Sequence, residues 1–323
     1  MIIGVYGDVH LTKNMRTMQS IWDVTAMKSL KMMYDKFDEL DVEMVVCLGD
    51  FFDAPRIEAK SMQLVMPILD MMEEKTYPTY ILLGNHEAES TDSNILEFLS
   101  SYNNITPVTT LTDVEHMIFV PYYEDLESIT DIIKHKIVFT HHDIYGSALA
   151  SGKTNAFFGA DPAVLSSARL VMNGHVHLKS KPAHNILNTG SLLVSQQGEL
   201  RVGEYPSYYI LDTHGAKYHE YNNEHSMIYL TIDVDDVSRV SQYDPAHLVL
   251  KVEYAGDMPE NWINTAHTSW RKKITSIEGK VEESVSTKNF DMRNYLVEYI
   301  KHDASVEDSV RDSYVNTGLE LLS

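Results

Sequence analysis

A chain of 323 residues with 44% hydrophobic residues is long enough for two ordinary domains and can bury a packed core over most of its length. Its 26 Lys and Arg residues against 47 Asp and Glu residues give a net charge of −21. That balance excludes a broad basic surface of the kind that binds nucleic acid unaided. A polyanionic substrate would need a local cationic site, bound metal ions or a partner.

The start of the chain and its apolar runs bear on location. The first residues, MIIGVYGD, lack the charged segment and the long apolar run of a secretory signal. No run reaches the roughly 18 uninterrupted apolar residues of a membrane-spanning helix. The one cysteine, Cys47, lies in an apolar run, and we interpret it as a small buried hydrophobe. We therefore expect a cytoplasmic protein without a membrane segment.

Short apolar runs alternate with helical patterns in the N-terminal part of the chain. Strands are predicted at Ile2–Tyr6, Met44–Leu48 and Tyr80–Leu83. Apolar residues at steps of three or four predict amphipathic helices over 21–40 and 62–72, and a shorter helix is predicted over 95–99. Alternation of strands and helices indicates a parallel sheet with helices packed against it, which is an α/β fold.

The remainder of the chain is predicted to be richer in strands. We expect strands at 117–120, 137–140 and 170–172 and a β-rich stretch over 186–209. From Glu204 onward, the pattern indicates a small α+β module with strands at Ser207–Leu211, Met227–Ile232 and His247–Tyr254, a helix after Pro259, and a strand near Ile274–Ile277. From Phe290, two short helices are predicted, which either fold back on the body or dock on another chain.

Five polar motifs each follow a predicted strand. They are Asp8-Val9-His10, Gly49-Asp50-Phe51-Phe52-Asp53, Gly84-Asn85-His86-Glu87, Thr140-His141-His142-Asp143 and Gly174-His175-Val176-His177. Any one of them could be an ordinary turn or helix cap. Because ligands of α/β sheets gather at the carboxyl ends of strands, the five together place carboxylate, imidazole and amide groups in one region. This is the ligand set that divalent transition metals favour, so the sequence predicts a metal site.

The ordered series of motifs resembles the calcineurin-like metallophosphoesterases. That resemblance implies a β-sandwich flanked by helices and two divalent cations. Asp8, His10 and His177 would hold the first cation, Asn85, His141 and His175 the second, and Asp50 both. His86 matches the family's catalytic histidine. Both His141 and His142 are candidates in the fourth motif, and we favour His141 because it follows the strand directly.

Finer features resemble the SbcD-type nucleases that repair DNA double-strand breaks, and the compact chain is most similar to the versions encoded by bacteriophages. The features are the Gly49–Asp53 motif with Arg56, and Asn188–Leu192 followed by Glu199. The resemblance implies a nuclease domain over 1–203, a DNA-capping domain over 204–285, and a helical tail over 286–323 that docks on an SbcC-like ATPase.

The same resemblance implies an activity and its requirements. The protein would be a manganese-dependent enzyme, with magnesium as the alternative metal. It would act as a 3′-to-5′ exonuclease and a single-strand endonuclease at DNA ends, as a homodimer, in the host cytoplasm if phage-encoded. The alternative function is a small-molecule phosphodiesterase or phosphatase of the same superfamily, which the acidic composition favours. A non-catalytic scaffold would lack ligands, whereas every ligand position is filled here.

Several basic residues lie in or beside the motif loops. Lys13, Arg56 and Lys179 are the candidate substrate-binding residues, and Arg16, Lys60, Lys153 and Lys181 lie near them in the sequence. They could form a local phosphate-binding rim on an acidic body. The alternative is that they are solvated loop charges.

Overall fold

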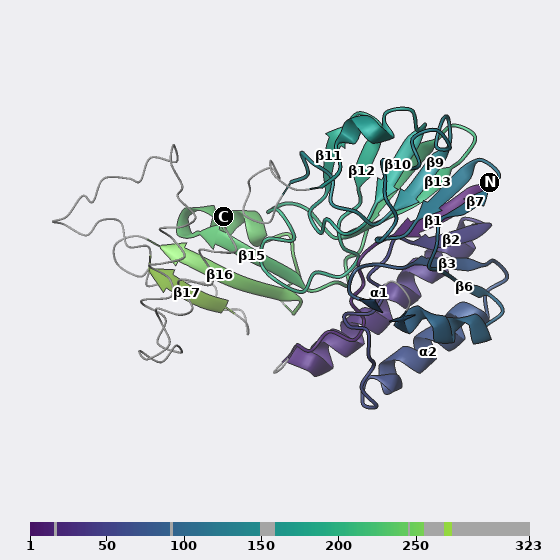
Figure 1. Cartoon of the computed structure of the whole chain (residues 1–323). Coiled ribbons are helices and arrows are strands. Elements are labelled where there is room, and N and C mark those ends of the chain that lie inside the picture. Colours follow the sequence, from purple (N-terminus) through teal and green to yellow (C-terminus); the bar gives the residue numbers. More distant parts are fainter. Residues whose placement is uncertain (16–17, 91–92, 149–158, 245, 255–267, 273–323) are drawn as a thin grey trace, which may run out of the picture. The chain divides into compact units, whose positions relative to one another are not determined.

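The computed structural model describes residues 1–15, 18–90, 93–148, 159–244, 246–254 and 268–272 (Figure 1). Within these residues, the first of two six-stranded sheets has the order β14-β13-β1-β2-β3-β6. Its parallel strands are β1 (Ile2–Tyr6), β2 (Met44–Cys47), β3 (Thr79–Leu82) and β6 (Ile105–Val108). Strand β13 (Ser207–Asp212) runs antiparallel to β1, and β14 (Lys217–Asn222) runs antiparallel to β13.

The second sheet has the order β11-β12-β10-β9-β8-β7. Its four central strands are parallel: β8 (Met117–Val120), β9 (Ile137–Thr140), β10 (Leu170–Asn173) and β12 (Ile186–Asn188). The edge strands β7 (Thr112–Val114) and β11 (Ser180–Ala183) are antiparallel to their neighbours. The parallel strands of each sheet therefore end at a common edge, where the motif loops begin.

A shared apolar core joins the two sheets face to face. Ile3 and Val5 of β1 lie in one buried cluster with Phe139 of β9 and Met172 of β10. The alternate positions of β1 face the helices instead. Gly4 is needed there because a Cβ atom at this position would lie 2.7 Å from the ring of Phe37. The period-two alternation of β1 thus builds two separate cores.

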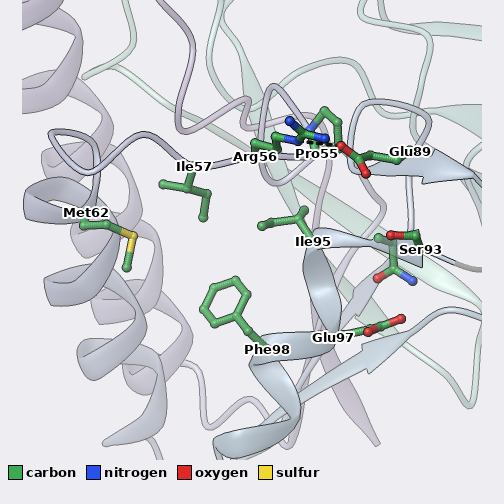
Figure 2. A pocket seen from close by; sticks show the side chains of 10 residues that line it. Pro55, Arg56, Ile57, Met62, Glu89, Ser93, Ile95, Glu97 and Phe98 are labelled. Atoms are coloured by element: carbon green, nitrogen blue, oxygen red, sulfur yellow. Dashed lines mark hydrogen bonds and ion pairs between the residues drawn. The ribbon is translucent and has the colours of Figure 1, made fainter.

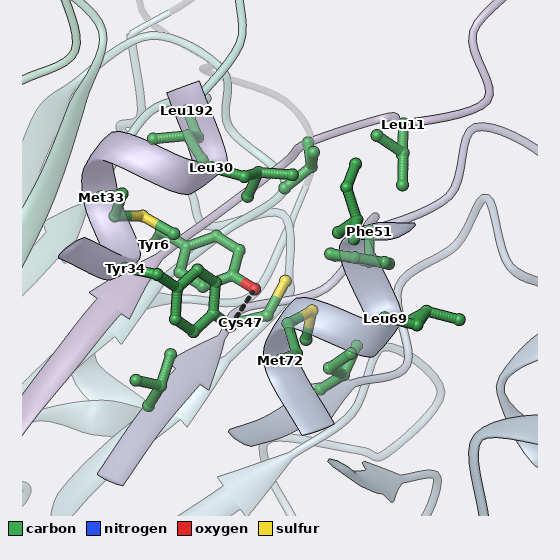
Figure 3. Packing of buried hydrophobic residues seen from close by; sticks show 14 of the residues in the cluster. Tyr6, Leu11, Leu30, Met33, Tyr34, Cys47, Phe51, Leu69, Met72 and Leu192 are labelled. Carbon is green, nitrogen blue, oxygen red and sulfur yellow. Dashed lines mark hydrogen bonds between the residues drawn. The ribbon is translucent and has the colours of Figure 1, made fainter. Parts of the chain in front are cut away.

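Two helices cover the other face of the first sheet. Helix α1 (Gln19–Glu39) and helix α2 (Met62–Glu73) place apolar side chains in one cluster with Tyr6 and Cys47 (Figure 3). Inside this cluster the hydroxyl groups of Tyr6 and Tyr34 lie 3.3 Å apart, which satisfies both without solvent. Cys47 is fully buried, in agreement with its interpretation as a core residue.

Shorter elements complete the described part of the chain. The 3₁₀-helices η2 (Ile95–Ser101) and η3 (Pro162–Leu165) and the ribbon of β4 (Ala88–Ser90) and β5 (Ser93–Asn94) lie in the connections. A separate parallel sheet consists of β15 (Ile228–Asp233), β16 (Leu248–Tyr254) and β17 (Thr268–Lys272), with η4 (Val234–Val240) after β15. Its buried residues, such as Leu230 and Val252, form a cluster with Val194 and Leu200. Within the described ranges, no helix combines the length and hydropathy needed to span a bilayer.

The predicted α/β class is confirmed, with one strand in an unexpected place. Strand Ser207–Leu211, assigned from the sequence to the small module, is β13 and pairs with β1 in the first sheet. Its alternating pattern identified a strand, but its partner lies some 200 positions earlier in the chain and leaves no local signal. The predicted helix after Pro259, the strand near Ile274–Ile277 and the tail helices from Phe290 lie outside the described residues.

Candidate metal centre

The five motif loops meet where the carboxyl ends of β1, β2, β3, β9 and β10 adjoin. The backbone N–H of His175 donates to Asp8 Oδ1 at 3.1 Å, which links the loop after β10 to the loop after β1. Gly49 and Gly174 leave room for the His141 ring between the sheets, because a Cβ atom at either position would lie within 2.8 Å of His141 Nδ1. Gly49 also has a φ of 104°, a conformation that other residues rarely adopt.

One group of ligand atoms comes from Asp8, His10, Asp50 and His177, and these atoms lie within 4.8 Å of one another. The Nε2 atoms of His10 and His177 are 3.1 Å apart. His177 Nε2 lies 3.6 Å from Asp8 Oδ1, and His10 Nε2 lies 3.8 Å from Asp50 Oδ2. If both rings carry their proton on Nδ1, both Nε2 atoms present lone pairs, and a shared cation would satisfy both.

A second group comes from Asp50, His141 and His175, with Asn85 between the two imidazoles. The Asn85 amide oxygen lies 3.2 Å from His141 Nε2 and 2.8 Å from His175 Nδ1. Asp50 Oδ2 lies 3.3 Å from His141 Nε2. The carboxylate of Asp50 therefore belongs to both groups. The seven side chains predicted as ligands come together at this edge.

Hydrogen bonds from behind fix the orientation of these imidazoles. Nδ1 of His141 donates to the carbonyl oxygen of Leu48 at 2.7 Å, and Nδ1 of His177 donates to Glu199 Oε1 at 2.6 Å. His10 Nδ1 lies 3.1 Å from Asp53 Oδ1, at ion-pair distance but without hydrogen-bond geometry. In His141 and His177, a proton on Nδ1 leaves the lone pair on Nε2, which is the atom that faces the cluster.

The residues present fit a divalent cation. Asp8 is fully buried, and its Oδ2 atom has no hydrogen-bond partner among the described residues. A buried carboxylate oxygen without a donor is unfavourable unless a cation lies next to it. Burial lowers the pKa of His141, but the Asp50 carboxylate outweighs burial and raises this pKa to about 9. The acidic groups of the cluster thus attract positive charge strongly, either as protons or as metal ions.

The predicted catalytic histidine lies at the rim of this cluster. The His86 side chain is 39% exposed, and its ring centroid is 4.7 Å from that of His10. Its Nδ1 atom lies 2.9 Å from the carbonyl oxygen of Asp53, and its backbone N–H donates to Asp50 Oδ1 at 3.0 Å. With Nδ1 engaged by the protein, Nε2 is the ring atom that can meet a substrate.

The structure places His141, not His142, beside Asp50. Both ring nitrogens of His142 are engaged elsewhere, at 2.6 Å from Thr140 Oγ1 and at 2.8 Å from the carbonyl oxygen of Glu124. Burial lowers the pKa of His142 to about 4, so its ring is neutral. His142 is therefore a structural residue of the loop after β9.

The three predicted substrate-binding residues differ in environment. Arg56 is 83% exposed and pairs with Glu89 through Nε at 2.6 Å, and Lys13 lies 3.4 Å from Asp53 Oδ1. Lys179 donates to Tyr205 O at 2.9 Å, Ser207 Oγ at 3.2 Å and Glu220 Oε1 at 2.6 Å. An ammonium group has three N–H donors, so these bonds use all of them. In this structure Lys179 links β13 to β14, and its binding to phosphate stays a prediction.

Sequence reasoning missed the carboxylates that support the cluster. Glu87 is fully buried and accepts hydrogen bonds from the backbone N–H groups of Asp50 (3.2 Å), Phe52 (3.0 Å) and Gly84 (2.7 Å). Burial, followed by the charge of Asp50, raises the pKa of Glu87 to about 8. Asp143 Oδ2 lies 3.1 Å from His175 Nε2. The only signal in the sequence was that Glu87 and Asp143 end motifs already assigned to the site.

Several candidate ligands have unusual backbone conformations. Asp8, His10, Asp50 and His175 have φ values of 46°, 48°, 49° and 65°. This left-handed region is uncommon for residues other than glycine, although Asp and His tolerate it better than most. Such conformations concentrate at functional sites, where the surrounding structure holds them in place.

In this β-sandwich, nitrogen and oxygen ligands lie together at the carboxyl ends of the strands. This arrangement is that of metal-dependent hydrolases with a metallophosphoesterase fold. The chain belongs to the calcineurin-like phosphoesterase family. The family's sequence profile matches residues 1–179, which are more than half of this chain. Members of this family act on phosphoesters and bind divalent metals, and the cluster described above is the candidate metal site.

Individual relatives are more distant. Protein 244L of Invertebrate iridescent virus 6, named as a phosphoesterase, is 24% identical over 197 residues, which cover 51% of this chain and 68% of that protein. An archaeal phosphodiesterase is 14% identical with a TM-score of 0.36, covering 69% of this chain and 99% of that one. A Pseudomonas putida nuclease is 15% identical with a TM-score of 0.34, covering 64% and 84%. Both structural similarities are weak, and neither bears on what this chain cleaves.

Proposed function

We propose that the protein is a metal-dependent DNA nuclease that processes DNA ends together with an SbcC-like ATPase. The observation that carries the phosphodiester chemistry is the position of Asp50, whose carboxylate is shared by two groups of ligand atoms at one strand edge. The choice of DNA as substrate is supported by the motif pattern, in which Gly49–Asp53 and Arg56 resemble SbcD-type nucleases.

The ligand roles follow from the two groups. One cation would be held by Asp8, His10 and His177, a second by Asn85, His141 and His175, and Asp50 would bridge them. Two such cations, manganese in our proposal, would neutralise the phosphate and lower the pKa of an attacking water. The protein's part is to fix ligand orientation, which it does through Glu199, Asp53 and the Leu48 carbonyl.

His86 would handle the proton of the leaving oxygen. Its ring is fixed by the Asp53 carbonyl and its backbone by Asp50, so its position is tied to the same loop that provides the bridging carboxylate. An imidazole that donates a proton or a hydrogen bond to a departing alkoxide stabilises the charge that develops there. The exposed rim position of His86 is compatible with an ester that reaches the site from solvent.

A cavity of about 200 Å³ opens beside the cluster and is lined in part by Asp143, His175, His177 and Glu199. Its lining includes the carboxylates of Asp143 and Glu199, and the whole chain carries a net charge of −21. A DNA strand would therefore approach against repulsion unless cations and a partner supplied the opposite charge. An SbcC-like ATPase, the partner that the resemblance implies, could supply that charge. A homodimer, a DNA-capping domain and a docking tail over 286–323 belong to the same proposal. Because β13 and β14 are strands of the first sheet, the capping domain would begin after Asn222 and not at position 204.

The experiment that tests this function compares two substrates in manganese. Purified protein is incubated with end-labelled linear duplex, with and without the ATPase, and in parallel with bis(p-nitrophenyl) phosphate. We expect the DNA to be degraded and the ATPase to accelerate it. Turnover of the chromogenic ester and small nucleotides without degradation of DNA in either condition would favour the alternative, a small-molecule phosphodiesterase, which the acidic charge supports.

A further inference from the structure

A second cavity, of about 460 Å³, is lined mainly by residues that follow Asp53 and His86 in the chain (Figure 2). One wall comes from the loop after β2, through Pro55, Arg56 and Ile57, and another comes from Glu89 and the segment that leads into η2. Figure 2 shows apolar side chains around the cavity, with the Arg56–Glu89 ion pair at one side. The apolar side chains are Ile57, Met62, Ile95 and Phe98.

Residues that line this cavity are close in sequence to His86 and to Asp53, which holds the His86 ring. Glu89 follows His86 by three residues, and Arg56 follows Asp53, whose carbonyl oxygen holds the His86 ring, by three residues. Three extended residues span at most about 11 Å. Successive phosphates of a strand in duplex DNA are about 3.4 Å apart along the axis. A strand bound with its scissile phosphate near His86 would therefore place a nucleotide within about three positions of that phosphate beside Arg56 and Glu89, where the cavity begins.

The chemistry of the walls selects one part of that nucleotide. Glu89 and Glu97 line the cavity, and Glu89 already neutralises Arg56 through a 2.6 Å contact, so the net charge disfavours a phosphate. The Phe98 ring is partly buried, held by Phe52 with ring centroids 6.0 Å apart, and borders the cavity. A flat, neutral, aromatic group suits such walls.

Polar groups at the mouth match the edge of a heterocycle. Asn94 Oδ1 accepts from the backbone N–H of Leu96 at 3.1 Å, which leaves its NH₂ group as a donor toward a ligand. The Glu89 and Glu97 carboxylates are acceptors for exocyclic amino groups, and both line the cavity. An apolar pocket of this size with a few polar groups at its edge is the usual form of a small-ligand subsite.

We infer that the cavity formed by Ile57, Met62, Ile95 and Phe98 is a nucleobase subsite, which binds one base of the cleaved strand and so positions its phosphate at the metal centre. The inference rests on the proposed function in so far as it assigns a nucleic-acid substrate to the same site. It adds the recognition of a base, which no residue of the metal centre supplies.

The test uses trideoxyadenylate, whose bases carry an exocyclic amino group, and three analogues, each of which lacks one base. They are assayed as inhibitors of bis(p-nitrophenyl) phosphate hydrolysis by the manganese-loaded full chain. Loss of one stacked base is expected to weaken inhibition about tenfold, at one position only. In Phe98→Ala, and in Ile57→Asp as a second variant on a partly exposed loop, the four compounds should inhibit nearly equally. Tyr123→Ala is the matched control, since this 47% exposed tyrosine does not line the cavity, and it should keep the tenfold difference.

Each outcome separates the inference from the proposed function. Equal inhibition by all four compounds with the wild-type chain would overturn the subsite, whether or not long DNA is cleaved. A difference that survives in both cavity variants would also overturn it. A change of oligomeric state in Phe98→Ala without any base preference would mark the cavity as a protein contact instead. Base-dependent inhibition without cleavage of long DNA would support the subsite and refute the nuclease.

Discussion

Replacing Glu199 with glutamine tests how far the metal centre depends on groups that never touch the metal. Glu199 Oε1 accepts the Nδ1–H of His177 at 2.6 Å, and Oε2 accepts backbone N–H groups of Ser195 at 2.8 Å and Gln196 at 3.2 Å. Every contact is one that a carboxylate accepts. A glutamine amide has one oxygen and one NH₂ group, so it cannot accept on both sides.

The expected loss follows from the two ways in which the amide can lie. If its oxygen stays with the backbone, its NH₂ group faces His177 Nδ1, and the proton of His177 moves to Nε2, where a cation must bind. If its oxygen stays with His177, its NH₂ group opposes two buried N–H donors. Removal of such an outer hydrogen-bond partner typically weakens metal binding about 10- to 100-fold, or about 1.4 to 2.7 kcal/mol.

The assay is a manganese titration against a fluorescent chelator, with circular dichroism as a check that the variant folds. Glu73→Gln is the matched control. Glu73 also accepts backbone N–H groups, from Asn103 at 2.9 Å and Asn104 at 2.8 Å, but it lies at the end of α2. We expect the control to bind manganese like the wild type. Manganese affinity within twofold of the wild type in folded Glu199→Gln would refute the orienting role.

Three further predictions concern the ligands and the rim. Asp50→Asn should lose both manganese and turnover, whereas His86→Ala should keep manganese and lose about 10²- to 10⁴-fold in kcat. Elemental analysis of bound manganese beside the rate assay distinguishes the two effects. Loss of manganese in His86→Ala would contradict the catalytic role of His86. Burial lowers the pKa of His141 but Asp50 raises it to about 9, so in the metal-free protein the ring is protonated below pH 9 and a cation must displace that proton. Manganese affinity should therefore rise about tenfold per pH unit between pH 7 and 9, and calorimetry that finds no proton release would disprove this. Only Nε of Arg56 is held by Glu89 and the side chain is 83% exposed, so its remaining N–H groups can still meet a phosphate outside the cavity, and Arg56→Ala should reduce the slope of log Kd for DNA against log salt by about one. Lys179→Ala should leave the slope unchanged because its three donors are engaged. Equal slopes for Arg56→Ala and the wild type would exclude Arg56 from phosphate binding.

Much of the fold was predictable because its central strands are short, apolar and followed by polar motifs. The runs at Ile2–Tyr6 and Met44–Leu48 become β1 and β2, and parallel strands necessarily bring the loops after them to one edge. Strand β14 was not predicted, because Lys217–Asn222 is a largely exposed edge strand with polar side chains. The pairing of β13 with β1 could not be read from local pattern either, since periodicity identifies a strand but not its neighbour.

The site shows the same division between residue type and environment. Asp50 and His141 carried a signal because their residue types and motif positions suit metals. Glu199 was named only as part of the segment that resembles SbcD-type nucleases. Its role could not be predicted, because it depends on a fold that brings Glu199 Oε1 within 2.6 Å of His177 Nδ1. The environment of Lys179 had no signal in the sequence either. Its place two residues after His177 suggested a phosphate contact, and only the structure shows that Glu220 and Ser207 hold its ammonium group.

The left-handed backbone at Asp8, His10, Asp50 and His175 affects which substitutions these positions can accept during evolution. Glycine adopts this conformation without a steric penalty, so replacement of any one of the four by glycine would relieve strain of up to about 1 kcal/mol while removing a ligand. Selection for catalysis is what opposes that drift. Homologues with glycine at one of these positions are therefore expected to be more stable and to lack hydrolase activity. The glycine would identify them from their sequences alone.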